Sequence, residues 1–453
     1  MSSSKLLEPQ SISYNQPVEH GQIHIVLPTK NSDFVHSART PHNESPALSQ
    51  AIHEFSTEYR KQPPSKKTMQ HSYVEKYLPL ESSPKFNSKC VNSEGGINYG
   101  MLLEDVDDIG GVVATRHTEW LGPSDIFTPC TVGTEQIYGN TQNSADDYKL
   151  VGHVAYTKGA LMVCFVSLET FWEKHASIDT RILHPKRVPP IGVSNSRTVA
   201  IFSVTMLFFD KLTKRLSPVS QIECVTAQEE YIHSQFEAIH SARKQIINMN
   251  KAQEQLCLYG NELVNNVGSR VQQLSFVPDG GSQEFVFISD TLVKSNYVPT
   301  PQQRNSYGVM FGGYVARASY ELACVGASYF LRSSEFRASQ LNDITFLLPI
   351  EIGDHVRSKA EIIYSSDPLN KGFVTRVVVE ARSPKDLDFK SAFIMHITFV
   401  PTDQTVQRKT VLPKTRKESI LWQRGHDIVQ TRNEYLSEYI NEIRYIGFNF
   451  CKL

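Results

Sequence analysis

A ten-residue stretch, residues 304–313, holds the residue types best suited to chemistry. The polar side chain of Asn305 precedes the pair Gly312-Gly313, which opens a predicted helix. Glycine lets a backbone approach a ligand closely, and the first N–H groups of a helix have no acceptor within the helix. Such N–H groups can hold a carbonyl oxygen that becomes an oxyanion, with Asn305 positioning a water or the carbonyl. Because Gly-Gly before a helix is common, a purely structural role stays open as the alternative.

The elements around this stretch form one segment of strands about a helix. Apolar spacing predicts the helix over residues 314–329, and a turn is predicted at residues 350–354. The strand-like runs of this segment are residues 284–289, 343–348, 355–364, 373–381 and 391–400.

An earlier segment has the same layout. Its helix is predicted from apolar positions 102, 103, 106 and 109. Its strand-like runs are residues 73–80, 112–114, 153–156, 161–168 and 198–209. The helix carries an acidic run, in which Asp107 shares a face with Leu103 while Glu104 and Asp108 lie on the neighbouring face. This favours an inward Asp107 over the alternative, a fully solvated acidic face.

The layout predicts five parts of the chain. A capping-box pattern, Thr226 with Glu229, begins a long amphipathic helix between the two segments. The parts are a disordered tail at 1–70, a first domain at 71–215, a helical connector at 216–280, a second domain at 281–402 and a C-terminal extension at 403–453.

Composition excludes several classes of protein. The 453 residues carry a formal net charge of −1, which gives no sign of a nucleic-acid footprint. No apolar run approaches the roughly 18 residues of a membrane span. Seven cysteines without a CxxC pair disfavour a disulfide framework or a zinc site. The patterns GxGxxG, GxxxxGK[ST], GxSxG and HExxH are absent, which disfavours nucleotide enzymes, serine hydrolases and zincins.

The order of several short motifs resembles the hot-dog-fold acyl-CoA thioesterases. Asn305, Gly308 and the glycine pair fall on matching positions of that family's motif, in which Phe311 replaces the usual histidine. Together with Asn342-Asp343-Ile344-Thr345-Phe346 and Leu103-Glu104-Asp105-Val106-Asp107, this resembles the subgroup of animal mitochondrial acyl-coenzyme A thioesterases 9 and 10. The resemblance covers about residues 70–420.

The resemblance implies an α+β fold of two tandem hot-dog domains that form an internal pseudo-dimer. Each domain wraps an antiparallel sheet round a long central helix, and acyl-CoA binds between the domains. It implies hydrolysis to a fatty acid and coenzyme A without cofactor or metal. It also implies a mitochondrial location, with a cytoplasmic one as the alternative because the presequence is weak, and assembly into trimers of two-domain chains.

Overlaying Gly100 on Gly313 predicts one composite site. The overlay sets Asp107 opposite Tyr320, so the catalytic pair is expected to be Asn305 and Asp107, with Glu321 as a second candidate carboxylate. The backbone of Gly312 and Gly313 is expected to hold the thioester carbonyl. The expected lining of the acyl or CoA pocket is Arg304, Tyr307 and Phe311.

Two alternative functions stay open on the same fold. A non-catalytic acyl-CoA sensor or scaffold is one, because the first segment lacks the Gly-Gly turn. A hydratase or dehydratase is the other, although Phe311 in place of histidine argues against it. His117, His153 and His396 fall in strand-like runs and are interpreted as structural.

Overall fold

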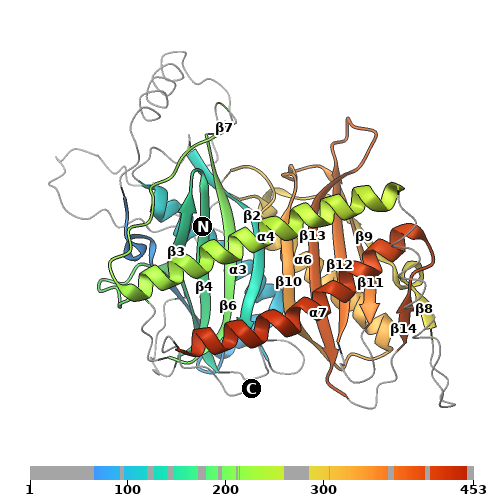
Figure 1. The fold of residues 1–453 in the computed structure, drawn as a ribbon, viewed down its shortest axis with the longest axis horizontal. Helices are drawn as coiled ribbons and strands as arrows, with labels where there is room; N and C mark the ends of the chain where they lie inside the picture. The colour runs from blue at the N-terminus through green and yellow to red at the C-terminus, as the bar shows by residue number, and fades with distance from the viewer. Residues whose placement is uncertain are drawn as a thin grey trace, which may run out of the picture. The chain divides into compact units, whose positions relative to one another are not determined.

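The computed structural model describes twelve stretches of the chain (Figure 1). They are residues 66–91, 96–119, 127–139, 146–171, 180–191, 196–210, 213, 215–259, 285–305, 307–365, 372–403 and 409–445. The expected disordered tail lies outside the described residues except for residues 66–70, and so do parts of the predicted connector and extension.

One twelve-stranded sheet contains both predicted segments. In spatial order its strands are β5 (Ile182–Leu183), β1 (Val74–Pro79), β3 (Asp147–Lys158), β4 (Leu161–Thr170), β6 (Thr198–Asp210), β2 (Phe127–Gly139), β10 (Phe336–Phe346), β13 (Lys390–Pro401), β12 (Phe373–Arg382), β11 (His355–Ser365) and β9 (Val293–Tyr297), with β7 (Arg215–Leu216) paired to β6. Every neighbouring pair is antiparallel. The halves join where β2 pairs β10, at Thr134 with Ile344 and at Gly133 with Thr345.

Each half of the sheet packs on one long helix. Helix α3 (Tyr99–Thr118) contacts β2, β3, β4 and β6, and α6 (Gly312–Leu331) contacts β11, β12 and β13. The apolar stripe of α3, which includes Val106, Ile109 and Val113, is fully buried. The two helices also contact each other, and one apolar core runs through both halves. The α+β fold of two hot-dog units expected from the sequence is therefore confirmed.

Three sequence predictions about these elements are wrong. Residues 112–114 belong to α3 and not to a strand, and His117 lies on the same helix. The helix continues through Gly110. A Cβ at this position would lie 2.9 Å from Val204 Cγ1, so the contact of α3 with β6 needs a glycine. Strand β10 begins at Phe336 rather than at residue 343, because the mixed burial of its first residues gives no clean alternation.

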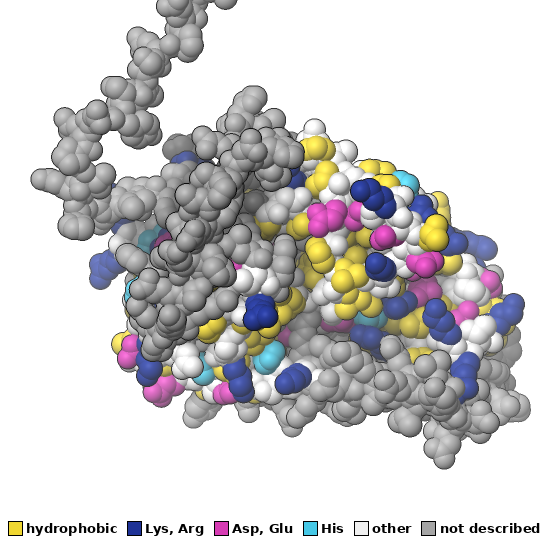
Figure 2. All heavy atoms as spheres, turned by 90° about the horizontal axis from the view of Figure 1, so that it is seen from above, with side chains coloured by type: hydrophobic (Ala, Val, Ile, Leu, Met, Phe, Trp, Pro, Cys, Tyr) yellow, Lys and Arg dark blue, Asp and Glu magenta, His cyan; other side chains and the backbone are white. Residues whose placement is uncertain are grey.

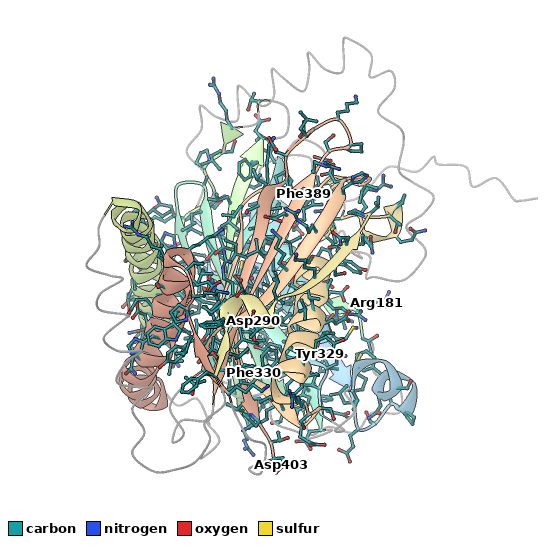
Figure 3. All side chains as sticks on the ribbon, turned by 90° about the vertical axis from the view of Figure 1, so that its right-hand side faces the viewer. Arg181, Asp290, Tyr329, Phe330, Phe389 and Asp403 are labelled. Atoms are coloured by element: carbon teal, nitrogen blue, oxygen red, sulfur yellow. The ribbon has the colours of Figure 1, made fainter. Side chains whose placement is uncertain are left out.

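Two further helices, α4 (Ala227–Tyr259) and α7 (Arg416–Tyr445), lie on the other face of the sheet (Figures 1 and 3). Phe236 of α4 packs edge-on against Phe165 of β4. Trp422 of α7 is buried against Tyr364 of β11, and its Nε1 donates to the carbonyl of Val411 at 2.9 Å. Both faces of the sheet are thereby covered.

The start of α4 confirms the predicted cap. The Glu229 amide donates to Thr226 Oγ1 at 3.2 Å, while the Glu229 carboxylate accepts from the Val225 amide at 2.6 Å. The carboxylate thus accepts the hydrogen bond of the backbone N–H before the cap residue, which holds the preceding chain against the helix.

The shorter elements complete the description. They are η2 (Met69–Ser72), α2 (Pro84–Cys90), η4 (Ile288–Thr291), η5 (Pro301–Gln303) and the parallel pair β8 (Phe285–Phe287) with β14 (Thr410–Leu412). Among the helices that the structure describes, none is long and apolar enough to cross a membrane. Cationic and acidic side chains are interspersed on the face shown in Figure 2.

Candidate active site

A tight hairpin, closed by a bridge between Arg304 and Met310, directly precedes the start of α6. The Asn305 side-chain oxygen accepts from the backbone amides of Tyr307 at 2.9 Å and Val309 at 3.3 Å. Gly308 takes a φ of +90°, which favours glycine. Both described contacts of the Asn305 side chain use its oxygen, so the residue shapes the hairpin while its amide nitrogen remains a donor for other groups.

The first two residues of α6 touch the other half of the molecule. A Cβ built on Gly312 would lie 2.9 Å from Asp107 Oδ2 and 3.0 Å from Phe346 Cε1. A Cβ on Gly313 would lie 2.9 Å from the carbonyl oxygen of Glu104. Glycine is needed at both positions for this close approach of α6 to α3. The structure therefore brings together Asp107, Gly312 and Gly313, as the sequence overlay predicts.

Asp107 is held in place by a hydroxyl group. Its side chain is 7 % exposed, and its Oδ1 accepts from Thr131 Oγ1 on β2 at 2.8 Å. The carboxylate lies at a helix N-terminus, where the partial positive charge of the helix favours an anion. Asp107 is thus oriented by β2 and electrostatically matched to the start of α6.

The rest of the acidic run faces inward too. Lys76 of β1 binds Asp105 at 3.0 Å and Asp108 at 3.1 Å. Burial by itself lowers the pKa of Lys76, but the two carboxylates outweigh it and raise the pKa above its ordinary value. Glu104 contacts Arg317 of α6 at 3.3 Å. The contacts described for these three acids are with cations, whereas the contact described for Asp107 is with a hydroxyl.

The remaining predicted site residues lie around the hairpin and along α6. Glu321 is exposed and pairs with Arg317 Nε at 2.9 Å on its own helix. Arg304 is exposed and bridges Met310 across the hairpin, and Tyr307 is half-buried. The ring of Phe311, the N-cap residue of α6, lies over Gly313.

The start of α3 is the position equivalent to this site in the internal repeat, and aromatic side chains fill it. The ring of Tyr99 lies 5.5 Å from that of Tyr320, and Tyr99 Oη donates to Gln136 Oε1 at 2.7 Å. A Cβ on Gly100 would lie 3.0 Å from Tyr320 Cδ1. Burial raises the pKa of the Tyr99 hydroxyl, which keeps it a neutral donor. Two aromatic rings occupy the space that corresponds to Asp107 and Gly312.

Sequence reasoning missed Thr131 and Phe346 as site neighbours. Thr131 lies on β2, which the sequence did not indicate as a strand, beside a register shift between Thr131 and Gly133. Phe346 ends β10 and stacks edge-on against Phe393. Neither residue has a local signal, because each reaches the site only through the tertiary packing of its strand.

Comparison with known proteins places the chain beside acyl-CoA thioesterases. No family model matches it. It is 24 % identical over 383 residues to acyl-coenzyme A thioesterase 9, mitochondrial, of Bos taurus, covering 83 % of this chain and 80 % of that protein. It is 23 % identical over 388 residues to acyl-coenzyme A thioesterase 10, mitochondrial, of Mus musculus, with the same coverage. The resemblance stated from the motifs is thereby confirmed.

Solved structures are similar at a lower level. The acyl-CoA hydrolase from Staphylococcus aureus in complex with butyryl coenzyme A matches 36 % of this chain and 99 % of its own, with 21 % identity and a TM-score of 0.33. A putative oleoyl thioesterase from Lactobacillus plantarum matches 74 % of this chain and 100 % of its own, with 8 % identity and a TM-score of 0.43.

Proposed function

We propose that the chain is an acyl-CoA thioesterase that hydrolyses fatty acyl-CoA at the start of α6. The observation that carries the proposal is the placement of the Asp107 carboxylate, from one half, against Gly312 at the helix N-terminus of the other half. A general base beside free backbone N–H groups is the arrangement that water attack on a carbonyl requires. Similarity to thioesterases 9 and 10 over most of the chain supports the same reaction class.

The proposed reaction needs only groups of this chain. The N–H groups of Gly312 and Gly313 hold the thioester oxygen, and Asp107 takes a proton from water that Asn305 orients. The water oxygen bonds to the carbonyl carbon, and the C–S bond then breaks. The products are the fatty acid and the coenzyme A thiol, which takes up the proton. General-base help contributes about 10²–10⁴-fold and one oxyanion donor roughly 10²–10³-fold.

We propose one active site per chain. The equivalent position, at the start of α3, has Tyr320 in place of Asp107 and Tyr99 in place of Gly312, and the two rings contact each other. At the start of α3 an aromatic ring therefore stands at each of the two positions that Asp107 and Gly312 take at the start of α6. We further propose Arg304, Tyr307 and Phe311 as pocket residues, since they surround the hairpin and the start of α6.

Three broader properties accompany the proposal. A mitochondrial location is proposed from the names of the related thioesterases. Domain limits of 71–215 and 281–402 are proposed, with the order of the strands in support, and a trimer of two-domain chains is proposed as the assembly. Acyl-coenzyme A is the proposed ligand.

Thiol release from a panel of acyl-CoAs, acetyl to palmitoyl, tests the function. We expect turnover by the wild type and a loss of at least about 10²-fold in both Asp107→Ala and Asn305→Ala. Glu321→Gln is the matched control, because Glu321 is exposed and paired along its own helix.

Other outcomes would revise the proposal. Acyl-CoA binding without turnover in the wild type would contradict it in favour of a sensor. Loss of activity in Glu321→Gln and Asn305→Ala but not in Asp107→Ala would move the general base to Glu321.

A further inference from the structure

An ion pair joins the two central helices close to the site. Arg317 Nη1 of α6 lies 3.3 Å from Glu104 Oε2 of α3. The Glu104 side chain is 8 % exposed, whereas that of Arg317 is 36 % exposed and also binds Glu321. One partner is therefore buried at the interface, and its carboxylate depends on charge from the facing helix.

The pair occupies a special place in the internal repeat. Glu104 and Arg317 are 213 positions apart, the offset that also separates Gly100 from Gly313 and Asp107 from Tyr320. Two residues that are equivalent in the repeat and also touch each other lie on its local two-fold axis. Two copies of α3 about such an axis would oppose two glutamates, and two copies of α6 would oppose two arginines. Opposite charges therefore meet on the axis only when α3 pairs with α6.

The ion pair lies about one helical turn from Asp107 on α3 and from Gly313 on α6. Asp107 follows Glu104 by three residues, and the carbonyl oxygen of Glu104 is itself the close neighbour of Gly313. Arg317 follows Gly313 by four residues on α6. A slide of one helix along the other would break the ion pair and separate Asp107 from Gly312 together.

We propose that Glu104 and Arg317 are positioning residues that fix the register of α3 against α6 and so hold Asp107 at the start of α6. The inference rests on the proposed thioesterase function. The ion pair touches no reacting atom and acts through the placement of Asp107. A misplacement of about 1 Å at a reacting group can cost roughly 10²-fold in rate.

Charge exchange in the full-length protein tests the proposal. We expect Glu104→Arg and Arg317→Glu each to lower kcat by about 10–10²-fold with KM changed less than about threefold, because orientation is lost and not substrate contact. The double exchange, Glu104→Arg with Arg317→Glu, restores opposite charges on the axis and is expected to recover most of kcat. Arg317→Lys is expected to retain more activity than Arg317→Glu.

A matched control comes from another pair of the same residue types. Arg376 of β12 binds Glu361 of β11 at 2.8 Å, away from the α3–α6 contact. The exchange Glu361→Arg with Arg376→Glu is expected to leave kcat unchanged. Single exchanges at 104 and 317 that lower only the melting temperature, with kcat of the folded protein intact, would overturn the positioning role, and so would a double exchange that recovers nothing.

Hydrogen exchange separates this inference from the function itself. Amide protection of residues 315–319, the first residues of α6 whose N–H groups have acceptors within the helix, reports the seating of α6 on α3 without any substrate. We expect both single exchanges to reduce this protection and the double exchange to restore it. A wild type without turnover would refute the thioesterase function, while unchanged protection in the single variants would refute the register role.

Discussion

The beginnings of α6 and α3 occupy equivalent places in the repeat and have opposite contents. At the start of α6, Gly312 packs closely against the carboxylate of Asp107, since a Cβ there would lie 2.9 Å from Oδ2. At the start of α3, Tyr99 takes the place of Gly312 and Tyr320 that of Asp107, and the rings lie 5.5 Å apart. The same backbone frame therefore supports one helix start with a glycine beside a carboxylate and another with two aromatic rings. Side-chain volume at two equivalent pairs of positions therefore distinguishes the two helix starts.

The side chains at the two helix starts are also held by different hydrogen bonds. Asp107 is oriented by a short hydrogen bond from Thr131, while Tyr99 is anchored through its hydroxyl to Gln136. The side-chain oxygen of Gln136, Oε1, also accepts from the Leu341 amide of β10 at 3.0 Å, across the junction of the two halves. The start of α3 is thus linked through Gln136 to the junction of the two halves.

The largest expected effect comes from adding a Cβ at the start of α6. In Gly312→Ala the new Cβ meets Asp107 Oδ2 and the Phe346 ring, so the carboxylate must turn away. We expect turnover to fall about 10²-fold and the unfolding free energy to fall by roughly 1–3 kcal/mol, measured by thiol release and urea unfolding. Gly326→Ala on the same helix is the control, because its Cβ would make an ordinary contact of 3.4 Å. Full activity in Gly312→Ala would contradict the placement of the site.

Opening the filled end is expected to cost stability without adding activity. Tyr320→Asp supplies the missing carboxylate but removes ring contacts to Tyr99 and Phe399. We expect the unfolding free energy to fall by roughly 1–3 kcal/mol, with no gain in turnover per chain because Tyr99 still fills the space. Tyr320→Phe should retain stability. A doubled turnover in Tyr320→Asp would show that the aromatic ring alone had closed a second site.

Acid is expected to weaken both halves through their buried histidines. Burial lowers the pKa of His153 in β3 and of His396 in β13 to about 4, and for His396 the adjacent Asp343 offsets part of this effect. The unfolded chain takes up these protons near pH 6.5, so stability is full above that value and is lost as pH falls toward 4. The slope is about 1.4 kcal/mol per pH unit for each histidine.

Urea unfolding at pH 7.5, 6.5 and 5.5 measures this slope. His396→Gln and His153→Gln should each flatten it by a similar amount, one from each half. Slopes equal to the wild type in both variants would assign the pH dependence to other groups.

The smallest expected effect is a stabilisation remote from either helix start. A Cβ on Gly111 of α3 meets nothing within 4 Å, unlike one on the neighbouring Gly110. Gly111→Ala should raise the unfolding free energy by about 0.5–1 kcal/mol through helix propensity and leave turnover unchanged. Gly110→Ala should instead lower it because of the contact with Val204. Thermal unfolding of the two variants, with kcat measured alongside, checks both expectations.

Local patterns predicted most of the fold in the second half and less of it in the first. Helix α6 and strands β11, β12 and β13 have clear apolar periods, and the structure confirms them. Residues 112–114 favoured a strand through their β-branched side chains, but burial along α3 overrides that preference. Strand β2 carries two register shifts, so its alternation is broken and its sequence gives little sign of a strand.

The sequence by itself determined the glycine pair, the hairpin asparagine and the equivalence of Asp107 with Tyr320, because these follow from residue types and spacing within a repeat. Tertiary structure alone decided that Thr131 holds the carboxylate of Asp107, that Phe346 packs beside Gly312, and that Glu104 and Arg317 meet across the helices. Each of those contacts joins residues distant in the chain. Their distances depend on how the sheet brings α3 against α6, and no local period encodes that packing.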